Sequence, residues 1–199
     1  MPTYRQCLKQ AQKQMQTAGL SEQSATLLML ELANMDSQNL YMDYEKEMPS
    51  ELEESFNEAF PRLLSGEPLQ HILGFEWFYG YRFKVNEDVL IPRPETELVV
   101  QEGVDWVTRS GMYRAKVVDL CAGSGAIGLA FASEVPGSEV WAVEKSATTA
   151  EWTRRNLDET AKRYPAIAGN YHLDIADATQ MPTLSQLDGT IDIVLTNPR

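Results

Sequence analysis

Cysteine and histidine are scarce in this chain, which has two of each among its 199 residues. Cys7 and Cys121 lie far apart, so the sequence offers no disulfide framework and indicates a reducing, cytoplasmic environment. His71 and His172 are isolated and no C-x-x-C pair is present. We therefore expect no structural zinc site and no other metal site.

Long apolar runs are also absent. The longest apolar patch, residues 27–32, is interrupted by Glu31 and is far shorter than the roughly 18 residues that a membrane span requires. The opening residues, MPTYRQC, do not place a basic segment before an apolar one. The sequence therefore predicts neither a secretory signal nor a membrane partner.

Positive charge is in short supply, with 17 Lys and Arg against 29 Asp and Glu and a net charge of −12. Proteins that bind nucleic acid tightly usually present a basic face to the phosphates, so no direct nucleic-acid binding is expected. The 43% of hydrophobic residues and 23% of charged residues are typical of a folded globular protein. The oligomeric state is left open.

The first third of the chain has helical patterns. Apolar residues recur at helical spacing over residues 4–19, and a second helix is expected over residues 21–34. Ser50 and Glu53 have the spacing of a capping box for a later helix. Pro61 is expected to kink or shorten that helix.

The pattern then changes to strands. Apolar and aromatic residues recur at every second position on both sides of Gly80, which predicts a β-hairpin over residues 75–85. They are Phe75, Trp77 and Tyr79, then Tyr81, Phe83 and Val85. A helix is expected over residues 94–109. Further on, apolar strand patterns alternate with helical ones, and the expected strands are residues 117–120, 140–143, 171–175 and 191–195.

This alternation predicts an α/β fold with right-handed βαβ units and a parallel, Rossmann-like sheet. Because the chain ends directly after the fourth strand, the sheet is expected to be incomplete. The expected domains are an N-terminal helical bundle at residues 1–68, a linking β-hairpin at residues 69–92 and the α/β domain at residues 93–199.

A glycine-rich segment, VVDLCAGSGAIG at residues 117–128, follows the first of these strands and has the pattern G-x-G-x-x-G. Glycines there allow a tight turn and the close approach of a ligand to the backbone. Glu144 ends the next strand, where a carboxylate can accept hydrogen bonds from both ribose hydroxyls of an adenosine. The two features together fit either NAD(P) or S-adenosylmethionine.

Asp119 helps to distinguish between NAD(P) and S-adenosylmethionine. It stands just before the loop, where its charge would repel the pyrophosphate of a dinucleotide but attract a cationic sulfonium or amino group. This favours S-adenosylmethionine as the cofactor, with S-adenosylhomocysteine as its product.

An Asn-Pro pair, Asn197 and Pro198, follows the last apolar strand, at the sheet edge where ligands bind in open α/β folds. The Asn side-chain oxygen and the following backbone carbonyls are hydrogen-bond acceptors. They can hold an –NH₂ group by both hydrogens and direct its nitrogen at a methyl donor. The alternative interpretation is an ordinary turn after a strand.

Taken together, these motifs resemble the release factor N5-glutamine methyltransferase family (HemK-type). The resemblance is carried by GEPLQHILGFEWFYGYRFKVNEDVLIPRPETELVV (residues 66–100), by VVDLCAGSGAIGLA from residue 117 and by IDIVLTNP (residues 191–198). It covers nearly the whole chain. Its most specific feature is the occurrence of the IPRPETE segment together with the other two motifs.

The resemblance implies an enzyme that transfers a methyl group from S-adenosylmethionine to the side-chain amide of the glutamine in the Gly-Gly-Gln motif of peptide chain release factors. Residues 1–68 would then dock the protein substrate. The implied catalytic, amide-binding residues are Asn197 and Pro198. The expected cofactor contacts are Asp119, Cys121, Ala122, Gly123, Ser124, Gly125, Glu144, Asp177, Ala178 and Asn197. Among them, the placement of Asp177 and Ala178 near the adenine rests on the resemblance alone.

The sequence departs from the family pattern at three places. Cys121 stands where the loop usually opens with Gly, and Glu144 where Asp is usual; both are expected to be tolerated. The family motif N-P-P-Y is cut short by Arg199, so a truncated and nearly inactive chain is expected. The alternatives are an adenine N6-methyltransferase acting on DNA or RNA, and a non-catalytic module that binds the cofactor or a release factor.

Overall fold

The computed structural model describes residues 1–180 and 183–198 and shows two compact units that divide between Gly74 and Phe75. The division differs from the boundaries expected at residues 68 and 92. A short helix after residue 68 packs into the first unit, and the hairpin expected to be a linker packs into the second. Arg199 lies outside the described residues.

The first unit is a bundle of helices, as predicted. Its helices are α1 (Tyr4–Thr17), α2 (Glu22–Ala33), α3 (Ser37–Met42), α4 (Ser50–Leu64) and α5 (Leu69–Leu73). Their apolar faces meet in one core, which includes Leu8, Met15, Leu28, Phe56 and Leu63. These residues recur at helical spacing in the sequence, so burial of the stripes that they form stabilises the bundle.

One local prediction for this unit is wrong and a second is wrong in part, because a kink at Pro61 stays a prediction while a shortened helix is not seen. The residue at the N-cap position of α4 is Pro49, and no side chain accepts a cap hydrogen bond there, so Ser50 forms no capping box. Pro61 does not shorten α4, which runs through it to Leu64. Proline lacks only its own backbone donor and clashes with the preceding turn, and the remaining residues of this helix still bury Leu63 in the core.

The second unit begins with the predicted hairpin of β1 (Phe75–Phe78) and β2 (Tyr81–Lys84). Tyr79 and Gly80 connect the strands with φ angles of +52° and +75°. Two positive φ values give a tight turn whose twist matches that of the strands. Phe78 and Phe83 are buried in the core of this unit, which makes the hairpin part of it.

Four parallel strands form the main sheet, in the order β5-β4-β3-β6. Their bounds are β3 (Lys116–Leu120), β4 (Glu139–Glu144), β5 (Tyr171–Ile175) and β6 (Ile193–Thr196), close to the predicted strands. The direction of the strand order reverses between β3 and β6. In open α/β sheets, ligands bind beside the carboxyl ends of the strands at such a reversal.

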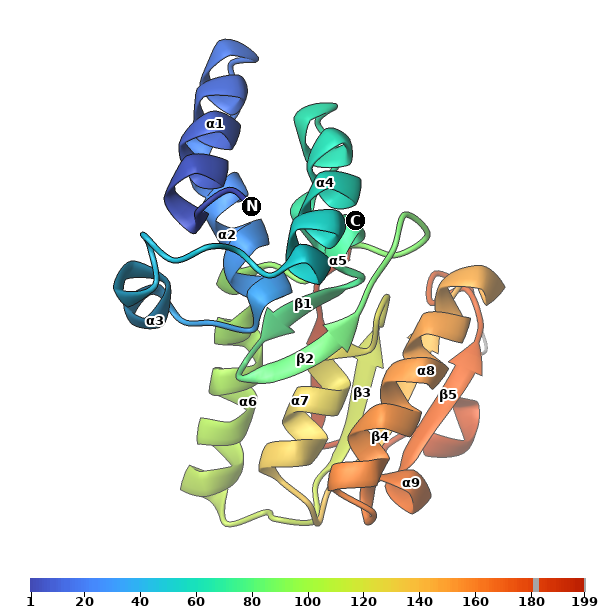
Figure 1. The fold of residues 1–199 in the computed structure, drawn as a ribbon. Coiled ribbons are helices and arrows are strands. Elements are labelled where there is room, and N and C mark those ends of the chain that lie inside the picture. The colour runs from blue at the N-terminus through green and yellow to red at the C-terminus, as the bar shows by residue number, and fades with distance from the viewer. Residues whose placement is uncertain (181–182, 199) are drawn as a thin grey trace. The chain divides into compact units, whose positions relative to one another are not determined.

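Helices cover one face of this sheet. Figure 1 shows α6 (Glu97–Ser110), α7 (Ala126–Glu134) and α8 (Ala147–Arg163) side by side along it. The shorter elements are η1 (Pro94–Thr96), α9 (Ile167–Asn170) and η2 (Ser185–Leu187). The α/β fold predicted from the alternating pattern is thus confirmed. Among the helices of residues 1–180 and 183–198, none is long and apolar enough to cross a membrane.

A close approach at Gly103 fixes how α6 packs. A Cβ atom added there would lie 3.1 Å from the ring of Phe131 on α7 and 3.2 Å from the side chain of Leu195 on β6. The absence of a side chain lets α6 pack tightly against both elements. As a result, the start of α6 lies beside the end of β6.

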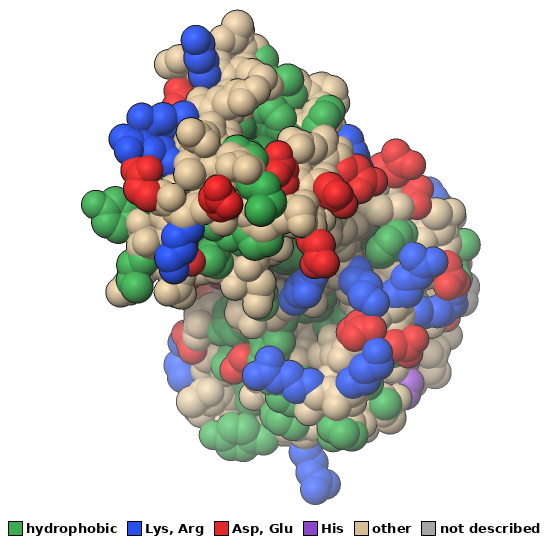
Figure 2. Space-filling view, viewed as in Figure 1, with side chains coloured by type: hydrophobic (Ala, Val, Ile, Leu, Met, Phe, Trp, Pro, Cys, Tyr) green, Lys and Arg blue, Asp and Glu red, His purple; other side chains and the backbone are tan. Residues whose placement is uncertain are grey.

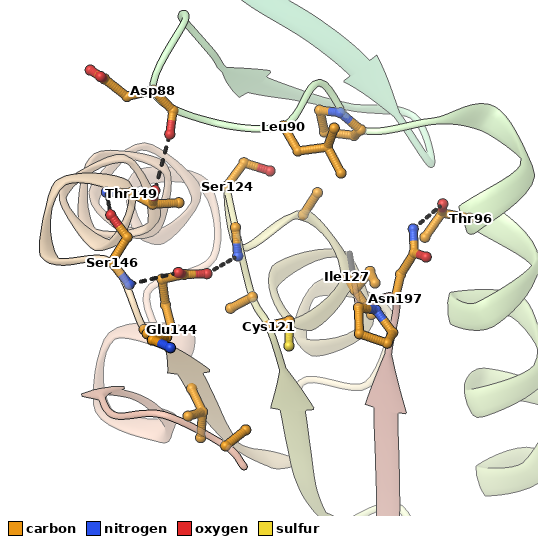
Figure 3. Close-up of a pocket in the computed structure, with 18 of the residues that line it drawn as sticks. Asp88, Leu90, Thr96, Cys121, Ser124, Ile127, Glu144, Ser146, Thr149 and Asn197 are labelled. Carbon is orange, nitrogen blue, oxygen red and sulfur yellow. Dashed lines mark hydrogen bonds between the residues drawn. The ribbon is translucent and has the colours of Figure 1, made fainter. Parts of the chain in front are cut away.

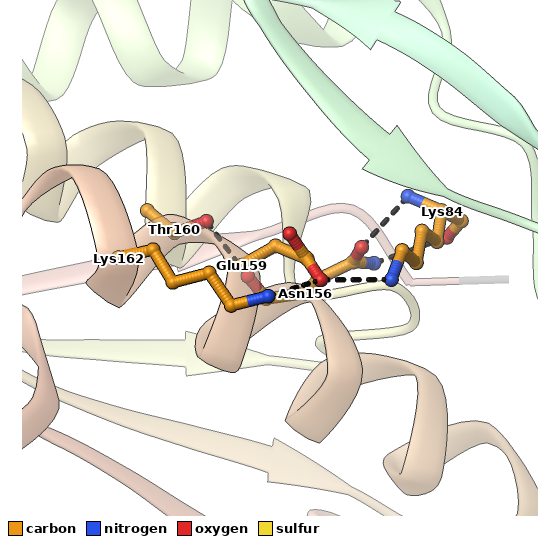
Figure 4. Close-up of polar contacts among 5 residues, drawn as sticks. All are labelled: Lys84, Asn156, Glu159, Thr160 and Lys162. Atoms are coloured by element: carbon orange, nitrogen blue, oxygen red, sulfur yellow. Dashed lines mark hydrogen bonds and ion pairs between the residues drawn. The ribbon is translucent and has the colours of Figure 1, made fainter.

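A buried asparagine joins the hairpin to the glycine-rich loop. The Asn156 side chain on α8 accepts a hydrogen bond from the backbone N–H of Lys84 at 2.7 Å and donates to the backbone C=O of Lys84 at 3.0 Å (Figure 4). It also donates to the backbone C=O of Ser124 at 2.9 Å. Glu159 on the same helix binds the Lys84 ammonium. The end of β2 is therefore held to the loop through α8.

We expect Asn156→Ala to lower the free energy of unfolding by about 1–3 kcal/mol, because it leaves part-buried backbone groups of Lys84 and the buried carbonyl of Ser124 without this partner. Urea denaturation monitored by circular dichroism measures this loss. Asp158→Ala, at an exposed position on the same helix, is the matched control and should change the free energy by much less. Equal losses in the two variants would contradict a structural role for Asn156.

Candidate functional site

A cavity of about 850 Å³ lies at the carboxyl ends of the parallel strands in the second unit. Figure 3 shows the ends of β4, β3 and β6 side by side, carrying Glu144, Cys121 and Asn197. Sites for small molecules commonly have volumes of about 300–1,000 Å³ and mostly apolar walls. Phe78, Leu90 and other apolar side chains line this cavity, which therefore suits a cofactor-sized ligand.

Most of the residues predicted from the sequence line this cavity together: Cys121, Ala122, Gly123, Ser124, Glu144, Asp177, Ala178, Asn197 and Pro198. They come from four segments that are distant in the sequence. Asp119 and Gly125 are not among the lining residues.

The loop between β3 and α7 turns through left-handed backbone. Cys121 has φ +63° and Gly123 has φ +59°. A residue other than glycine pays about 1–2 kcal/mol for this conformation, which explains why glycine suits the first position better than cysteine. A Cβ atom added at Gly123 would meet nothing closer than the Cys121 carbonyl oxygen at 4.0 Å. The space beside this backbone is therefore open to a ligand.

Gly125 has a different role from the predicted one. It has φ +79°, and an added Cβ atom would lie 2.8 Å from the Thr153 methyl carbon and 3.2 Å from the Tyr171 hydroxyl. Glycine at this position lets the start of α7 pack against α8 and β5. The glycine pattern thus serves two needs, one at the cavity and one in packing.

Glu144 ends β4 and holds the loop. Its two carboxylate oxygens accept hydrogen bonds from the backbone N–H groups of Gly123 and Ser146, each at 2.9 Å. A carboxylate offers about four lone-pair sites, so about half of this capacity remains for a ligand. Glu144 lines the cavity and can accept from two hydroxyls.

Asp119 does not reach the cavity, contrary to the prediction that it contacts the cofactor. Its side chain is fully buried and accepts a hydrogen bond from the backbone N–H of Gly128 at 2.9 Å. Side chains alternate between the two faces of a strand, and this one faces α7. Burial raises the pKa of Asp119 to about 7; the Gly128 hydrogen bond opposes this shift and the charge of Glu144 adds to it.

Asp177 and Ala178, expected near an adenine, line the cavity beyond β5. The Lys145 ammonium lies 2.9 Å from the Asp177 carboxylate, which also accepts from the backbone N–H and hydroxyl of Thr179. Hydrogen bonds from Lys145 and Thr179 hold the pKa of Asp177 well below its usual range. The carboxylate is therefore ionised and its orientation is set by three donors.

Asn197 follows β6 on the other side of the loop. Its side-chain nitrogen Nδ2 donates a hydrogen bond to the Thr96 hydroxyl at 2.9 Å (Figure 3). Pro198 lines the cavity next to it. The Asn-Pro pair therefore shares one cavity with the glycine loop and with Glu144.

The sequence reasoning missed several residues that complete the cavity wall. The missed positions that matter most are Phe78, Asp88, Leu90, Pro92, Arg93, Thr96, Ile127, Lys145, Ser146, Thr149 and Thr179. Three of them belong to the IPRPETE segment, whose unusual composition was the available signal. The Thr149 hydroxyl donates to the Asp88 backbone C=O at 3.0 Å and ties the segment before that motif to α8.

Two family models match this chain. The model described as "PrmC N-terminal domain" matches residues 6–74, and the model described as "Conserved hypothetical protein 95" matches residues 82–198. A release factor glutamine methyltransferase of Bifidobacterium longum is 54% identical over 197 residues, which cover 96% of this chain and 67% of that protein. The chain belongs to the release factor glutamine methyltransferase family.

Other members of this family and a relative with another name also match. The release factor glutamine methyltransferase of Chlorobaculum tepidum is 34% identical over 88% of this chain and 59% of its own length. The 4-amino-L-phenylalanine/4-methylamino-L-phenylalanine methyltransferase of Streptomyces pristinaespiralis is 30% identical over 99% of this chain and 65% of its own length. The chain thus spans about two thirds or less of the length of these curated relatives.

The buried carboxyl of Asp119 makes the stability of this family member depend on pH. Its pKa is about 7 when folded and near 3.9 in an unfolded chain, so the folded state binds more protons between these values. The contribution of Asp119 to stability therefore falls as pH rises through this window and is lowest above pH 7.

We expect Asp119→Asn to remove this loss, because a neutral amide can still accept from Gly128 N–H. Relative to the wild type, the variant should gain about 2–3 kcal/mol between pH 5 and pH 8. Urea denaturation at several pH values measures the difference. Asp158→Asn, at an exposed position, is the control. If the free energy of unfolding varied with pH in the same way in the wild type and in Asp119→Asn, the raised pKa of Asp119 would be refuted.

Proposed function

We propose that this chain holds the cofactor-binding and amide-binding parts of an enzyme that transfers a methyl group from S-adenosylmethionine to the glutamine side-chain amide of peptide chain release factors. One observation carries the proposal: Asn197 and Pro198 line the same cavity as the glycine loop and Glu144. The relative that is 54% identical bears the name of this activity. The glutamine of the Gly-Gly-Gln motif is the proposed acceptor.

The residues of the cavity fit an adenosyl cofactor. The open space beside Gly123 admits a ligand close to the backbone, and Glu144 has acceptor capacity for two ribose hydroxyls. The volume of about 850 Å³ is large enough for the cofactor and a side chain together. We assign Glu144 to the ribose, the loop at Cys121–Ser124 to the methionine part and Asp177 with Ala178 to the adenine.

An amide nitrogen is a poor nucleophile because its lone pair is delocalised into the carbonyl group. S-adenosylmethionine, when bound, supplies an electrophilic methyl group on its sulfonium. Asn197 Oδ1 and the Pro198 carbonyl would accept the two amide hydrogens and orient the nitrogen toward that methyl group. The N–CH₃ bond would form as the S–CH₃ bond broke, one amide proton would pass to water, and S-adenosylhomocysteine would be the product.

Positioning is the main contribution of these residues. Holding two reactants in the correct geometry can lower a barrier by about 7–11 kcal/mol. Asp192 is not placed to act as a base, because its carboxylate accepts from the backbone N–H of Lys116 at the opposite end of β6. The proposed mechanism therefore depends on alignment and on acceptors for the amide hydrogens.

A small aromatic amine is the second candidate substrate. It is supported by the relative from Streptomyces pristinaespiralis, whose name specifies an amino-phenylalanine. The lower identity of that relative, 30% against 54%, ranks this candidate below the release factor. Both substrates present an –NH₂ group that the Asn-Pro pair can hold.

An adenine amino group in DNA or RNA ranks below both. On the face drawn in Figure 2, Lys and Arg side chains are interspersed with Asp and Glu side chains. Together with the net charge of −12, this distribution disfavours contact with phosphates. Docking of the protein substrate by the N-terminal helical unit stays a prediction, as does the absence of nucleic-acid binding.

We expect Glu144→Ala to weaken binding of S-adenosylhomocysteine at least several-fold, because a lost hydrogen bond to a charged group costs about 1.5–3 kcal/mol. Isothermal titration calorimetry measures the affinity. Glu139→Ala, at the other end of β4, is the matched control and should bind as the wild type does. Unchanged affinity in a folded Glu144→Ala variant would overturn the ribose assignment.

We expect Asn197→Ala to abolish the methyl transfer to purified release factor that the wild-type chain retains, while S-adenosylhomocysteine binding falls little. Misplacement by about 1 Å can cost about 100-fold in rate, and this variant removes the acceptor altogether. Peptide mass spectrometry locates the methyl group on the release factor. A parallel assay with 4-amino-L-phenylalanine tests the second candidate. Methylation of that amine alone would refute the release factor proposal.

A further inference from the structure

We propose that Thr96 is the positioning residue for Asn197, an inference that rests on the proposed function. The Thr96 hydroxyl accepts a hydrogen bond from Asn197 Nδ2 at 2.9 Å, across 101 positions of sequence. Both residues line the cavity, and Thr96 is only 7% exposed. The contact therefore sits at the point where the substrate amide is proposed to bind.

The hydroxyl of Thr96 does not cap its own helix. Thr96 is the last residue of η1, and its φ of −76° and ψ of −16° are already helical. A capping threonine has extended backbone and accepts from a backbone N–H of the first turn. No such cap bond is present at Thr96, and its hydroxyl accepts from Asn197 instead.

Both partners are held on rigid supports. The carboxylate of Glu97, the next residue after Thr96, accepts from the backbone N–H of Tyr79 in the hairpin turn at 2.7 Å. On the other side, the Thr196 hydroxyl donates to the Leu120 backbone C=O at 3.0 Å and fixes the end of β6 to β3. A hydrogen bond between two fixed supports restricts the side-chain rotation of Asn197.

This arrangement determines which group Asn197 offers. Its Nδ2 is engaged by Thr96, and among the described residues no protein donor binds its Oδ1. The free oxygen is an acceptor, which an –NH₂ substrate requires. Rotation of the amide by half a turn would place N–H groups against the N–H groups of the substrate. In the observed arrangement Asn197 therefore presents an acceptor to substrates that donate hydrogen, and the contact gives the IPRPETE segment a role in the site.

The test compares Thr96→Val, which keeps the shape and removes the acceptor, with Thr96→Ser, which keeps the hydroxyl. Thr108→Val is the matched control, because Thr108 is exposed on the same helix and its hydroxyl binds only the Val104 carbonyl. We expect Thr96→Val to lower kcat for release factor about tenfold, with affinity for S-adenosylhomocysteine unchanged. Thr96→Ser should restore kcat to within about threefold.

A second readout does not depend on activity. In ¹H–¹⁵N spectra, Asn197→Asp identifies the side-chain amide signals of Asn197. These signals should shift in Thr96→Val and keep their positions in Thr96→Ser and Thr108→Val. If the wild-type chain methylates no release factor, as expected for a truncated chain, the calorimetry on Glu144→Ala tests the cofactor site and the spectra alone decide on Thr96. Unshifted Asn197 signals, or a loss of cofactor affinity that accompanies any fall in kcat, would overturn the positioning role.

Discussion

The hydrogen bonds from α8 to the glycine loop are the contacts on which the rest of the site depends. The Thr153 hydroxyl donates to the Gly123 backbone C=O at 2.7 Å, and Asn156 donates to the Ser124 backbone C=O. Buried carbonyls need such partners, because leaving one unpaired costs free energy comparable to a lost hydrogen bond. The loop can bend around an open space only because side chains of α8 donate hydrogen bonds to its backbone carbonyls.

The same helix also sets the opposite wall of the cavity. Thr149 binds the Asp88 carbonyl and Asn156 binds the end of β2, so the segment that covers the loop is attached to the helix that supports the loop. Thr149, Thr153 and Asn156 fall on one face of α8, at spacings of four and three residues. A single rigid element thus fixes the width of the cavity, which suits a site that works by positioning.

Several local features of the site carry a cost in stability. Cys121 adopts a left-handed conformation that glycine takes freely, and Asp119 is buried where ionisation is disfavoured. These departures lie beside the cavity and α7. Such clustering is expected where geometry for a ligand takes precedence over local stability.

The sequence by itself determined the alternation of strands and helices, because the periodicity of apolar residues depends only on which face is buried. It also placed the glycine loop, Glu144 and Asn197 at strand ends, since parallel strands direct their carboxyl ends to one edge. Tertiary structure alone decided that Asp119 faces α7, that Gly125 serves packing and that Thr96 meets Asn197. Those outcomes depend on close approaches between elements distant in the chain, which no local pattern records.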